Sequence, residues 1–370
     1  MVTPPLPSAE RTALLALWAV PGIGSVGLGG MRAWAAGRWQ DLLDTPARDW
    51  VDGLPASDLV RARLRAAGTL RAVADEVRDR AAQGDMQVVH PGDPGYPDRL
   101  AEIRDAPPVL FMRGAPARPR RRLAMVGTRH PEQGFLRHAR AFAAAVSAGG
   151  AGVVSGAAAG VDRACHLGAL DVGGETWAFL GSALDVVDGA QARLVPGILD
   201  GGGAVYSELP PGIRASKQTF PRRNRLIAGA SDVVLILRAG ENSGTRYTIA
   251  AARDQGRPIL ALPGETWARS AQLCNRVVAR GVGRLCMGPE DALRAVGLDA
   301  KSVAEPGPGP MPGLSEVAGQ LYRLLGREPR PIEALEEGAG LEPGSAVSAL
   351  CELELLGLAV QVPGRLYQRV

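Results

Sequence analysis

Residues 217–244, KQTFPRRNRLIAGASDVVLILRAGENSG, predict a helix that leads directly into a buried strand. Pro221 suits the first turn of a helix, because the N–H group that proline lacks would have no partner there. We expect the helix to span Pro221–Ala230 and to stop at Ser231 and Asp232. The continuous apolar run Val233–Leu237 then has the composition of a buried strand. A helix followed by such a strand is half of an α/β repeat, so this stretch decides the fold class.

The same stretch gathers cations, one aromatic ring and one amide. Forked guanidinium groups and free backbone N–H groups suit phosphates, while a flat apolar ring suits an unstacked base. Each residue alone has a plainer explanation: Phe220 packs the helix start, Asn224 caps a turn, or an arginine pairs with an acid. The cluster as a whole predicts a nucleic-acid contact. Its candidate binding residues are Lys217, Phe220, Arg222, Arg223, Asn224 and Arg225, and Arg238 is a further arginine of the cluster across the strand.

Strands and helices alternate on both sides of this stretch. The strands are expected at Leu123–Val126, Gly152–Val154, Thr176–Leu180, Ala204–Ser207, Val233–Leu237 and Ile259–Leu262. The helices are expected at Gly134–Ala148, Gly160–Leu170, Ala190–Leu199, Pro221–Ala230, Thr245–Gln255 and Ala268–Arg280. This alternation predicts an α/β fold with a Rossmann-like parallel sheet and helices on both faces. Ligands of such sheets lie at the carboxyl ends of the strands, where this sequence places glycines and small polar residues.

The end of the first of these strands has the composition of a phosphate-binding turn. Gly127, Thr128 and Arg129 place a bare amide, a hydroxyl and a cation in succession. Such a turn can wrap a phosphate with its amides while the arginine neutralises the charge. The alternative is a solvated arginine on an ordinary loop. Ser155 and Gly156 end the next strand and complete the candidate binding residues.

The net charge alone does not predict a polyanionic partner. The formal net charge is only +4, and of the 42 basic residues only Lys217 and Lys301 are lysines. A coding bias explains single arginines well, but it explains less well the clusters Arg118–Arg122 and Arg222–Arg225. At 370 residues the chain is long enough for two or three domains.

Cysteine spacing and hydropathy indicate a protein of the cytoplasm. The cysteines, Cys165, Cys274, Cys286 and Cys351, are far apart and form no CxxC pair. We therefore expect buried thiols in a reducing compartment, not disulfides or a zinc site. The sequence has no signal peptide and no apolar run long enough to cross a bilayer, so no membrane partner is expected.

The pattern changes at both ends of the α/β region. We expect a helical domain at 1–84, the Rossmann-like domain at 85–300, a Pro/Gly linker at 301–313 and a winged-helix-like domain at 314–370. The GxGxxG match at Gly22–Gly27 follows a helix, so it predicts a helix–turn–helix of the helix-hairpin-helix or sterile-alpha-motif type, favouring a structural role. Gln87–Gly114 predicts an ordered strand pair. The last helix carries Glu352 and Glu354, which favours a protein contact over groove reading.

No pattern predicts a catalytic residue, a metal site or a cofactor. Cys165 and His166 are neighbours, so on a helix they point about 100° apart and cannot form a nucleophile–base pair. The GxxxxGK[ST] phosphate loop is absent. One enzymatic alternative stays open, because Asn242–Thr245 is similar to the glycine-rich turn of nucleotide phosphoribohydrolases; their next residue is a glutamate, where Arg246 stands here. A nucleotide-sensing scaffold is a further alternative.

Taken together, the motifs resemble the DNA-processing protein A family, also called DprA or Smf. The resemblance is carried, in order, by Tyr96-Pro97…Leu100, Pro107–Phe111…Gly114, Val126–Arg129, Val154–Gly156…Gly160–Asp162…His166, Ser207–Pro210, Phe220–Gly229, Ser243–Thr245 and Leu262–Gly264. Thr128 and Phe135 stand where the family usually has Ser and Tyr. Ser182–Val187 lacks the usual Tyr-Pro, and Ser270–Asn275 lacks a glycine. We expect these two differences to alter the shape of the loops and of the surface near Trp267–Arg280.

The resemblance implies a non-catalytic protein that binds single-stranded DNA, with duplex DNA open as a second partner. It also implies homodimers and the loading of a RecA-type recombinase during natural transformation. By motif, Arg129 and the run Phe220–Arg225 would contact DNA phosphates and bases. No cofactor is implied.

Overall fold

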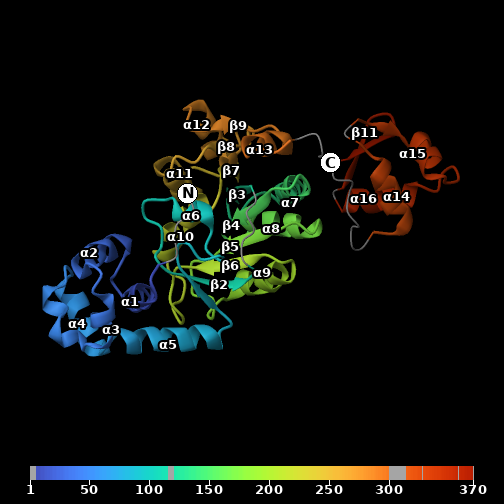
Figure 1. The fold of residues 1–370 in the computed structure, drawn as a ribbon. Helices are drawn as coiled ribbons and strands as arrows, with labels where there is room; N and C mark the ends of the chain where they lie inside the picture. The colour runs from blue at the N-terminus through green and yellow to red at the C-terminus, as the bar shows by residue number, and fades with distance from the viewer. Residues whose placement is uncertain (1–5, 116–120, 300–313, 327, 357, 370) are drawn as a thin grey trace. The chain divides into compact units, whose positions relative to one another are not determined.

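The computed structural model describes residues 6–115, 121–299, 314–326, 328–356 and 358–369 (Figure 1). The expected linker at 301–313 and most of the basic cluster Arg118–Arg122 lie outside these ranges. The chain divides into two compact units, Met1–Val303 and Ala304–Val370, which are described separately.

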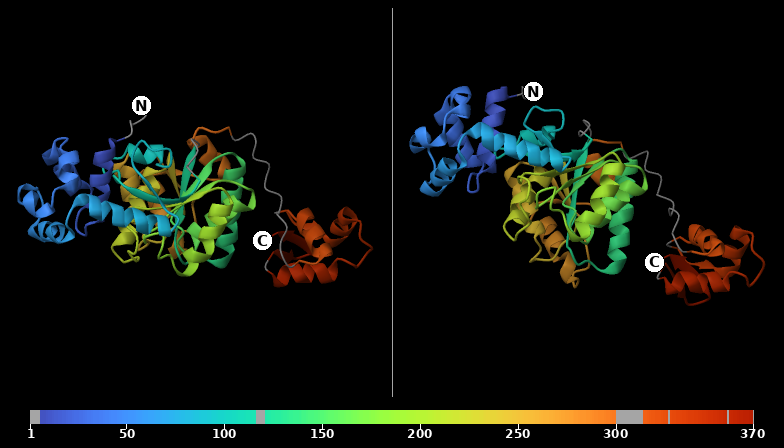
Figure 2. Two further views of the ribbon diagram at one scale, coloured as in Figure 1. Left: turned by 60° about the horizontal axis from the view of Figure 1, so that its bottom comes forward. Right: turned by 90° about the horizontal axis from the view of Figure 1, so that it is seen from below.

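The first unit begins with helices. They are α1 (Ser8–Ala19), α2 (Ser25–Ala35), α3 (Trp39–Asp44), α4 (Asp58–Ala67) and α5 (Leu70–Gln83). Gly22 has φ +98° in the turn that joins α1 to α2, so the expected helix–turn–helix is confirmed. The α5 helix runs along one edge of the sheet (Figures 1 and 2). Trp18 on α1 donates its indole N–H to the Glu208 carbonyl at 2.6 Å, which attaches these helices to the segment preceding the candidate site.

Within the described residues of the first unit, nine strands form one sheet in the order β1-β2-β6-β5-β4-β3-β7-β8-β9. Their bounds are β1 Gln87–Val89, β2 Leu110–Gly114, β3 Arg122–Gly127, β4 Gly152–Ser155, β5 Thr176–Phe179, β6 Ala204–Ser207, β7 Val233–Arg238, β8 Ile259–Ala261 and β9 Arg284–Leu285. The strands from β6 to β9 along this order are parallel, while β1 and β2 pair antiparallel, as the expected strand pair. The sheet is therefore Rossmann-like and mostly parallel, with helices on both faces as predicted.

Helices cover both faces of this sheet. They are α6 (Asp98–Ala101), α7 (Gln133–Ala148), α8 (Val161–Asp171), α9 (Gly189–Asp200), α10 (Thr219–Gly229), α11 (Thr245–Asp254), α12 (Gln272–Ala279) and α13 (Pro289–Ala295). Apolar side chains of α7, α8 and α13 pack with one face of the central strands. Those of α6, α10, α11 and α12 pack with the other face, and Figure 1 shows the two layers on either side of the strands. The expected helix Ala268–Arg280 begins as a 3-10 turn, Arg269–Ala271, before α12.

The direction of winding changes at β3. Strands β4, β5 and β6 follow β3 on one side, and β7, β8 and β9 lie on its other side. Loops on the two sides of such a reversal lead away from each other, which leaves a crevice at the carboxyl ends of the strands. The loops after β3 and β7 therefore flank the place where a ligand is expected.

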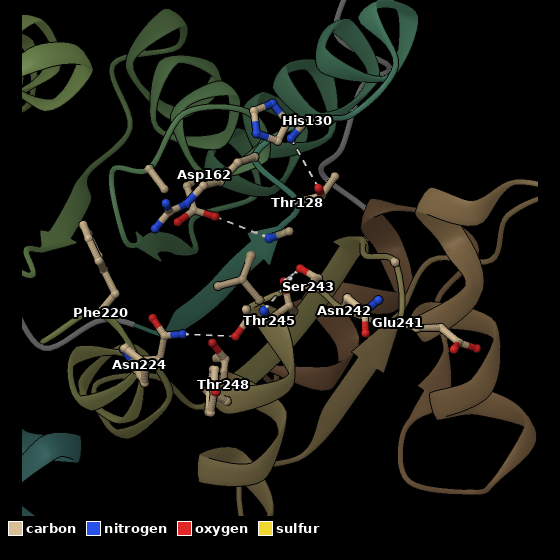
Figure 3. A pocket seen from close by; sticks show the side chains of 18 of the residues that line it. Thr128, His130, Asp162, Phe220, Asn224, Glu241, Asn242, Ser243, Thr245 and Thr248 are labelled. Carbon is tan, nitrogen blue, oxygen red and sulfur yellow. Dashed lines mark hydrogen bonds between the residues drawn. The ribbon is translucent and has the colours of Figure 1, made fainter. Parts of the chain in front are cut away.

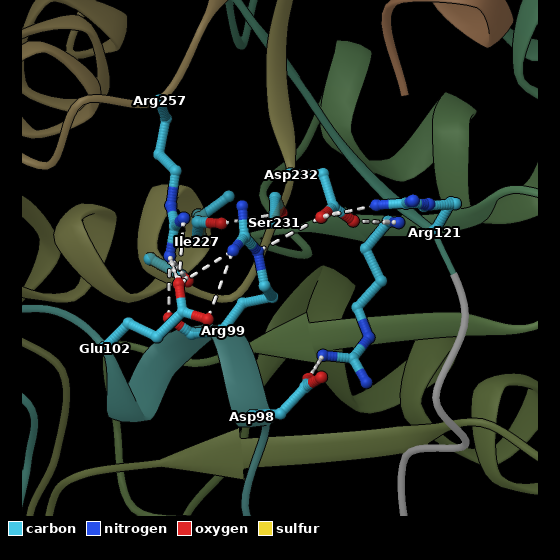
Figure 4. Close-up of polar contacts among 10 residues, drawn as sticks. Asp98, Arg99, Glu102, Arg121, Ile227, Ser231, Asp232 and Arg257 are labelled. Atoms are coloured by element: carbon cyan, nitrogen blue, oxygen red, sulfur yellow. Dashed lines mark hydrogen bonds and ion pairs between the residues drawn. The ribbon is translucent and has the colours of Figure 1, made fainter. Parts of the chain in front are cut away.

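A network of ion pairs fixes the far end of α10 (Figure 4). Arg257 donates to the Gly229 carbonyl at 3.2 Å and pairs with Glu102 at 3.2 Å. Arg99 pairs with Asp232, just beyond α10, at 3.1 Å. Because this end is held against α6, the opposite end of α10 is presented at the crevice.

The second unit is a small winged-helix domain. It contains α14 (Glu316–Leu324), β10 (Arg330–Pro331), α15 (Ile332–Ala339), α16 (Val347–Leu355), β11 (Ala359–Val362) and β12 (Leu366–Arg369). The strands β11 and β12 form the expected closing hairpin. Cys351 is exposed here, which corrects the expectation that every cysteine is buried; on α16 the buried residues are Ala349, Leu350 and Leu353, on the opposite side. All four thiols are free.

Candidate nucleic-acid interface

A pocket of about 850 Å³ lies in the crevice at the carboxyl ends of β3 and β7 (Figure 3). The loop after β3, the start of α10 and the loop after β7 line most of it. Residues after β8 complete the lining, among them Arg269, Ser270 and Gln272. The pocket thus takes in the predicted strand ends after β3 and β7, while Ser155 and Gly156 after β4 lie outside its lining.

Arg129 and Phe220 meet in this pocket. The Arg129 side chain is exposed, and its Cζ atom lies 4.8 Å from the centroid of the Phe220 ring. Gly181, just after β5, lies close to the ring, because an added Cβ there would be 3.0 Å from Phe220 Cδ1. A larger residue at this position would require the ring to shift by a few tenths of an ångström. The pair offers a flat apolar surface beside a cation, which are the two requirements that the sequence predicted.

Asp162 already fills the amide cradle that the sequence assigned to a phosphate. Its buried carboxylate accepts hydrogen bonds from the N–H groups of Gly127 at 3.3 Å and Gly156 at 3.2 Å. Burial raises the pKa of the Asp162 carboxyl, although the nearby Arg223 charge opposes that effect. The expectation that Gly127 offers a bare amide is therefore corrected, because the Asp162 carboxylate accepts from it and also from the Gly156 N–H. Ser155 is also buried, and its hydroxyl donates to the Met125 carbonyl at 2.6 Å.

Arg223 lies inside the wall of the pocket, with its side chain directed away from solvent. It is 3% exposed and donates to the carbonyls of Gly156, at 2.6 Å, and Phe179. Burial lowers the pKa of the Arg223 guanidinium to about 10. A Cβ on Gly156 would collide with this guanidinium, so the glycine is needed for the close approach. The structure thus corrects the prediction that Arg223 presents a free fork to phosphate, because its donors hold the β4 and β5 loops together.

The other arginines of the decisive stretch also face away from the pocket. Arg225 pairs with Glu208 and donates to the Asp105 carbonyl at 2.7 Å. Arg238 lies between two carboxylates, Glu132 and Glu265, each at 3.2 Å. Arg222 is exposed but lies outside the lining, near Gly24 of the α1–α2 turn. The arginines of α10 point in different directions because adjacent residues on a helix point about 100° apart.

The exposed cations of the lining are Arg129, Lys217 and Arg269, within the described part of the chain. Neither Lys217 nor Arg269 forms an ion pair there. The sequence prediction included Lys217 and missed Arg269, although Arg269 follows the carboxyl end of β8, where the same strand-end rule applies. Thr128 lies beside Arg129 and accepts a hydrogen bond from the His130 N–H at 3.3 Å.

The lining also contains amides and hydroxyls. Asn224 donates to the Gly244 carbonyl at 3.3 Å, which ties the start of α10 to the start of α11. Ser243 and Thr245 lie 2.9 Å apart through their hydroxyl oxygens. Glu241 lines the pocket but is paired with Arg276, and the other lining carboxylate is Asp162. Among the described residues, no three His, Cys, Asp or Glu side chains form a group that could hold a metal ion.

Comparisons with known proteins identify the family to which the chain is similar. Residues 87–297 match the family model of DNA recombination-mediator protein A, and residues 305–365 match the DprA winged helix domain. The chain is 30% identical to Protein Smf of Synechocystis sp. over 322 residues, which covers 78% of this chain and 81% of that protein.

Two solved structures share the fold. The crystal structure of DNA processing protein A from Streptococcus pneumoniae is 26% identical, with a TM-score of 0.63, and the match covers 78% of this chain and 98% of that one. DNA processing protein A from Helicobacter pylori, described for its unique single-stranded DNA binding mode, is 23% identical with a TM-score of 0.50. That match covers 57% of this chain and 95% of the other.

Proposed function

The chain belongs to the DNA recombination-mediator protein A family, and from this premise we propose that it binds single-stranded DNA in the pocket at the carboxyl ends of β3 and β7. The observation that carries the proposal is the exposed Arg129 guanidinium over the Phe220 ring. Lys217 and Arg269 add two further exposed cations to the lining of the same pocket.

The geometry favours an unpaired strand over duplex DNA. A base can reach the Phe220 ring only when it is free of its partner, because stacking on a side chain requires an exposed base face. The flexible backbone of a single strand then brings its phosphates to Arg129 and Lys217. Phosphate contacts of this kind depend strongly on salt, because binding releases counterions.

The site is suited to binding without turnover. Hydrolysis of a nucleotide needs a carboxylate that is free to act on the ribose or on water, and both lining carboxylates are occupied. Asp162 accepts backbone hydrogen bonds, and Glu241 is paired with Arg276. A nucleotide phosphoribohydrolase and a nucleotide-sensing scaffold are the alternatives that an experiment has to separate from DNA binding.

We further propose the biological setting. The protein acts in the cytoplasm as a homodimer, protects incoming DNA and loads a RecA-type recombinase onto it during natural transformation. The domains divide at 1–84, 85–300, 301–313 and 314–370, and the winged-helix domain has a protein-contact role. Among the described residues, no helix combines the length and apolar character that crossing a membrane needs.

Fluorescence anisotropy with labelled oligo(dT) tests the proposal. We expect the full chain to bind oligo(dT) more tightly than a duplex of equal length, and Arg129→Ala to weaken that binding about 10- to 100-fold. Arg253→Ala is the matched control, because Arg253 is exposed at the far end of α11 and outside the lining. Unchanged affinity in Arg129→Ala would overturn the proposed site. Release of free base from nucleoside monophosphates would instead establish the hydrolase.

Recombinase loading needs its own measurement. We expect the protein to raise the DNA-dependent ATPase rate of a RecA-type recombinase on oligonucleotides coated with single-strand-binding protein. The Arg129→Ala variant should lose this stimulation, because it no longer holds the strand. Stimulation that is absent with the unaltered protein would reject the mediator role and leave DNA binding in place.

A further inference from the structure

A second aromatic ring lines the same pocket. Tyr247 lies in the first turn of α11, and Phe220 lies in the first turn of the neighbouring α10. Each ring has a guanidinium over it: Arg129 Cζ is 4.8 Å from the Phe220 centroid, and Arg246 Cζ is 4.9 Å from the Tyr247 centroid. The pocket therefore contains the same combination of a flat ring and a cation at two places.

Tyr247 makes little contribution to the core. It is 41% exposed, whereas Tyr96, Tyr206 and Tyr367 are each less than a tenth exposed. Its hydroxyl accepts a hydrogen bond from Arg246 at 3.0 Å, and Arg246 is itself exposed. A large aromatic surface left open inside a pocket suits a flat ligand, because a base gains by stacking on a ring that solvent otherwise covers.

The two helix starts that carry the rings are joined directly. The Asn224 amide donates to the Gly244 carbonyl at 3.3 Å, which links the start of α10 to the residue that precedes α11. Figure 3 shows Phe220 and Asn224 on the same side of the pocket, with Thr245 facing them from α11. Uncharged hydrogen-bonding groups, namely Asn224, Ser243 and Thr245, therefore lie along the wall that joins the two helix starts.

We propose that Tyr247 is a second base-stacking residue, so that the pocket holds two nucleotides of one DNA strand, one base on Phe220 and another on Tyr247. This inference rests on the proposed function. A pocket of about 850 Å³ is at the upper end of the range for a whole small-molecule ligand, which leaves room for more than one nucleobase. Arg246 supports the Tyr247 ring from one face, and the base covers the ring from the other.

Replacing the ring separates stacking from other roles. We expect Tyr247→Ala to weaken oligo(dT) binding about 10-fold, in line with the loss of one stacked base. Tyr247→Phe should keep the affinity, because it keeps the flat ring. Tyr247→Leu should lose it, although leucine is apolar and fills much of the same space. All of these variants should unfold at the temperature of the unaltered protein, because Tyr247 is largely outside the core.

Abasic oligonucleotides then identify the stacked base. The series consists of oligonucleotides that each lack one base at a different position. At one of these positions we expect the unaltered protein and Tyr247→Ala to bind with equal affinity, because the base that Tyr247 contacts is already missing. Phe220→Ala and the unaltered protein should likewise bind with equal affinity when the missing base is at a different position. The salt dependence of binding should be the same in Tyr247→Ala as in the unaltered protein, since a neutral ring releases no counterions.

The outcomes distinguish this inference from the proposed function. If Tyr247→Ala binds every oligonucleotide like the unaltered protein while Arg129→Ala binds weakly, the second stacking site is rejected and DNA binding stands. The same holds if Tyr247→Leu binds as well as Tyr247→Phe, which would show that only volume matters. If the unaltered protein does not bind oligo(dT), both proposals are rejected together.

Discussion

The guanidinium of Arg129 lies over the ring of Phe220, with 4.8 Å between Cζ and the ring centroid. The two residues are far apart in the sequence but meet beside neighbouring strands, since Arg129 follows β3 and Phe220 begins α10, which precedes β7. Because the guanidinium and the ring are in contact, we expect a change at one residue to alter the contribution of the other.

The first prediction concerns this coupling. Arg129→Ala and Phe220→Ala should each weaken oligo(dT) binding by about 1–3 kcal/mol. The loss of binding free energy in the double variant should be smaller than the sum of the two single losses by about 0.5–3 kcal/mol, because residues in contact are not independent. Anisotropy titrations of all four proteins give this coupling energy. Strictly additive losses would show that the contact has no part in binding.

The second prediction concerns salt. Removing one phosphate contact from a single-stranded complex should reduce the slope of log K against log[salt] by about 0.7. We expect this reduction in Arg129→Ala, Lys217→Ala and Arg269→Ala, whose side chains are exposed in the lining. Arg253→Ala should keep the original slope. A slope that stays constant in the three lining variants would mean that phosphates do not contact these residues.

The third prediction separates two arginines that lie one turn apart on α10. Arg225 is held by Glu208 and the Asp105 carbonyl, so Arg225→Ala should lower the melting temperature. Arg222 is exposed, so Arg222→Ala should leave the melting temperature within a degree or so, as for most surface substitutions. Differential scanning fluorimetry compares the two. Equal melting temperatures would contradict the different roles that burial assigns to them.

The fourth prediction concerns the buried charges. Arg223→Ala leaves the Asp162 carboxylate buried without its nearby cation, which should cost about 3–5 kcal/mol of unfolding free energy. DNA binding should weaken in parallel, because Arg223 holds the Gly156 and Phe179 carbonyls behind the pocket. Urea unfolding measures the stability. A variant that loses DNA affinity at full stability would instead mean that Arg223 contacts the strand.

The fifth prediction is a loss of stability in acid. The Nε2 atom of His166 accepts the Ala157 N–H at 3.3 Å, so the ring is neutral, and burial lowers the His166 pKa to about 3. The unfolded chain binds this proton near pH 6.5, so the stabilising contribution is complete above pH 6.5 and is lost as the pH falls toward 3. Urea unfolding at pH 7.5 and pH 5 should therefore show lower stability at pH 5.

A histidine variant isolates this effect. His166→Gln should be less stable at pH 7.5 but should lose less on going to pH 5. Some pH dependence should persist, because burial also lowers the pKa of His90, to about 4, with the same sign. If His166→Gln loses as much unfolding free energy between pH 7.5 and pH 5 as the unaltered protein, His166 is excluded as a source of the pH dependence.

Local patterns in the sequence predicted much of the fold. Each of the six expected strands lies within one residue of its predicted bounds, and the expected helix–turn–helix is present at Gly22. These features depend on periodicity and on backbone-specific residues such as glycine and proline, whose effects act over a few positions. The same patterns predicted a ligand site at the carboxyl ends of the strands, where the structure has a pocket, because the direction of parallel strands determines which loops meet.

The sequence by itself determined the α/β class, the edge of the sheet that forms the pocket, and Arg129 and Phe220 as residues of that pocket. Only the tertiary structure decided which cations face solvent. Arg222, Arg223 and Arg225 are close in sequence, yet one is exposed, one is buried in the wall and one is paired with Glu208. Asp162, distant in sequence from Gly127, occupies its amide. Burial and pairing depend on what other segments bring to the same point, and that information is not local.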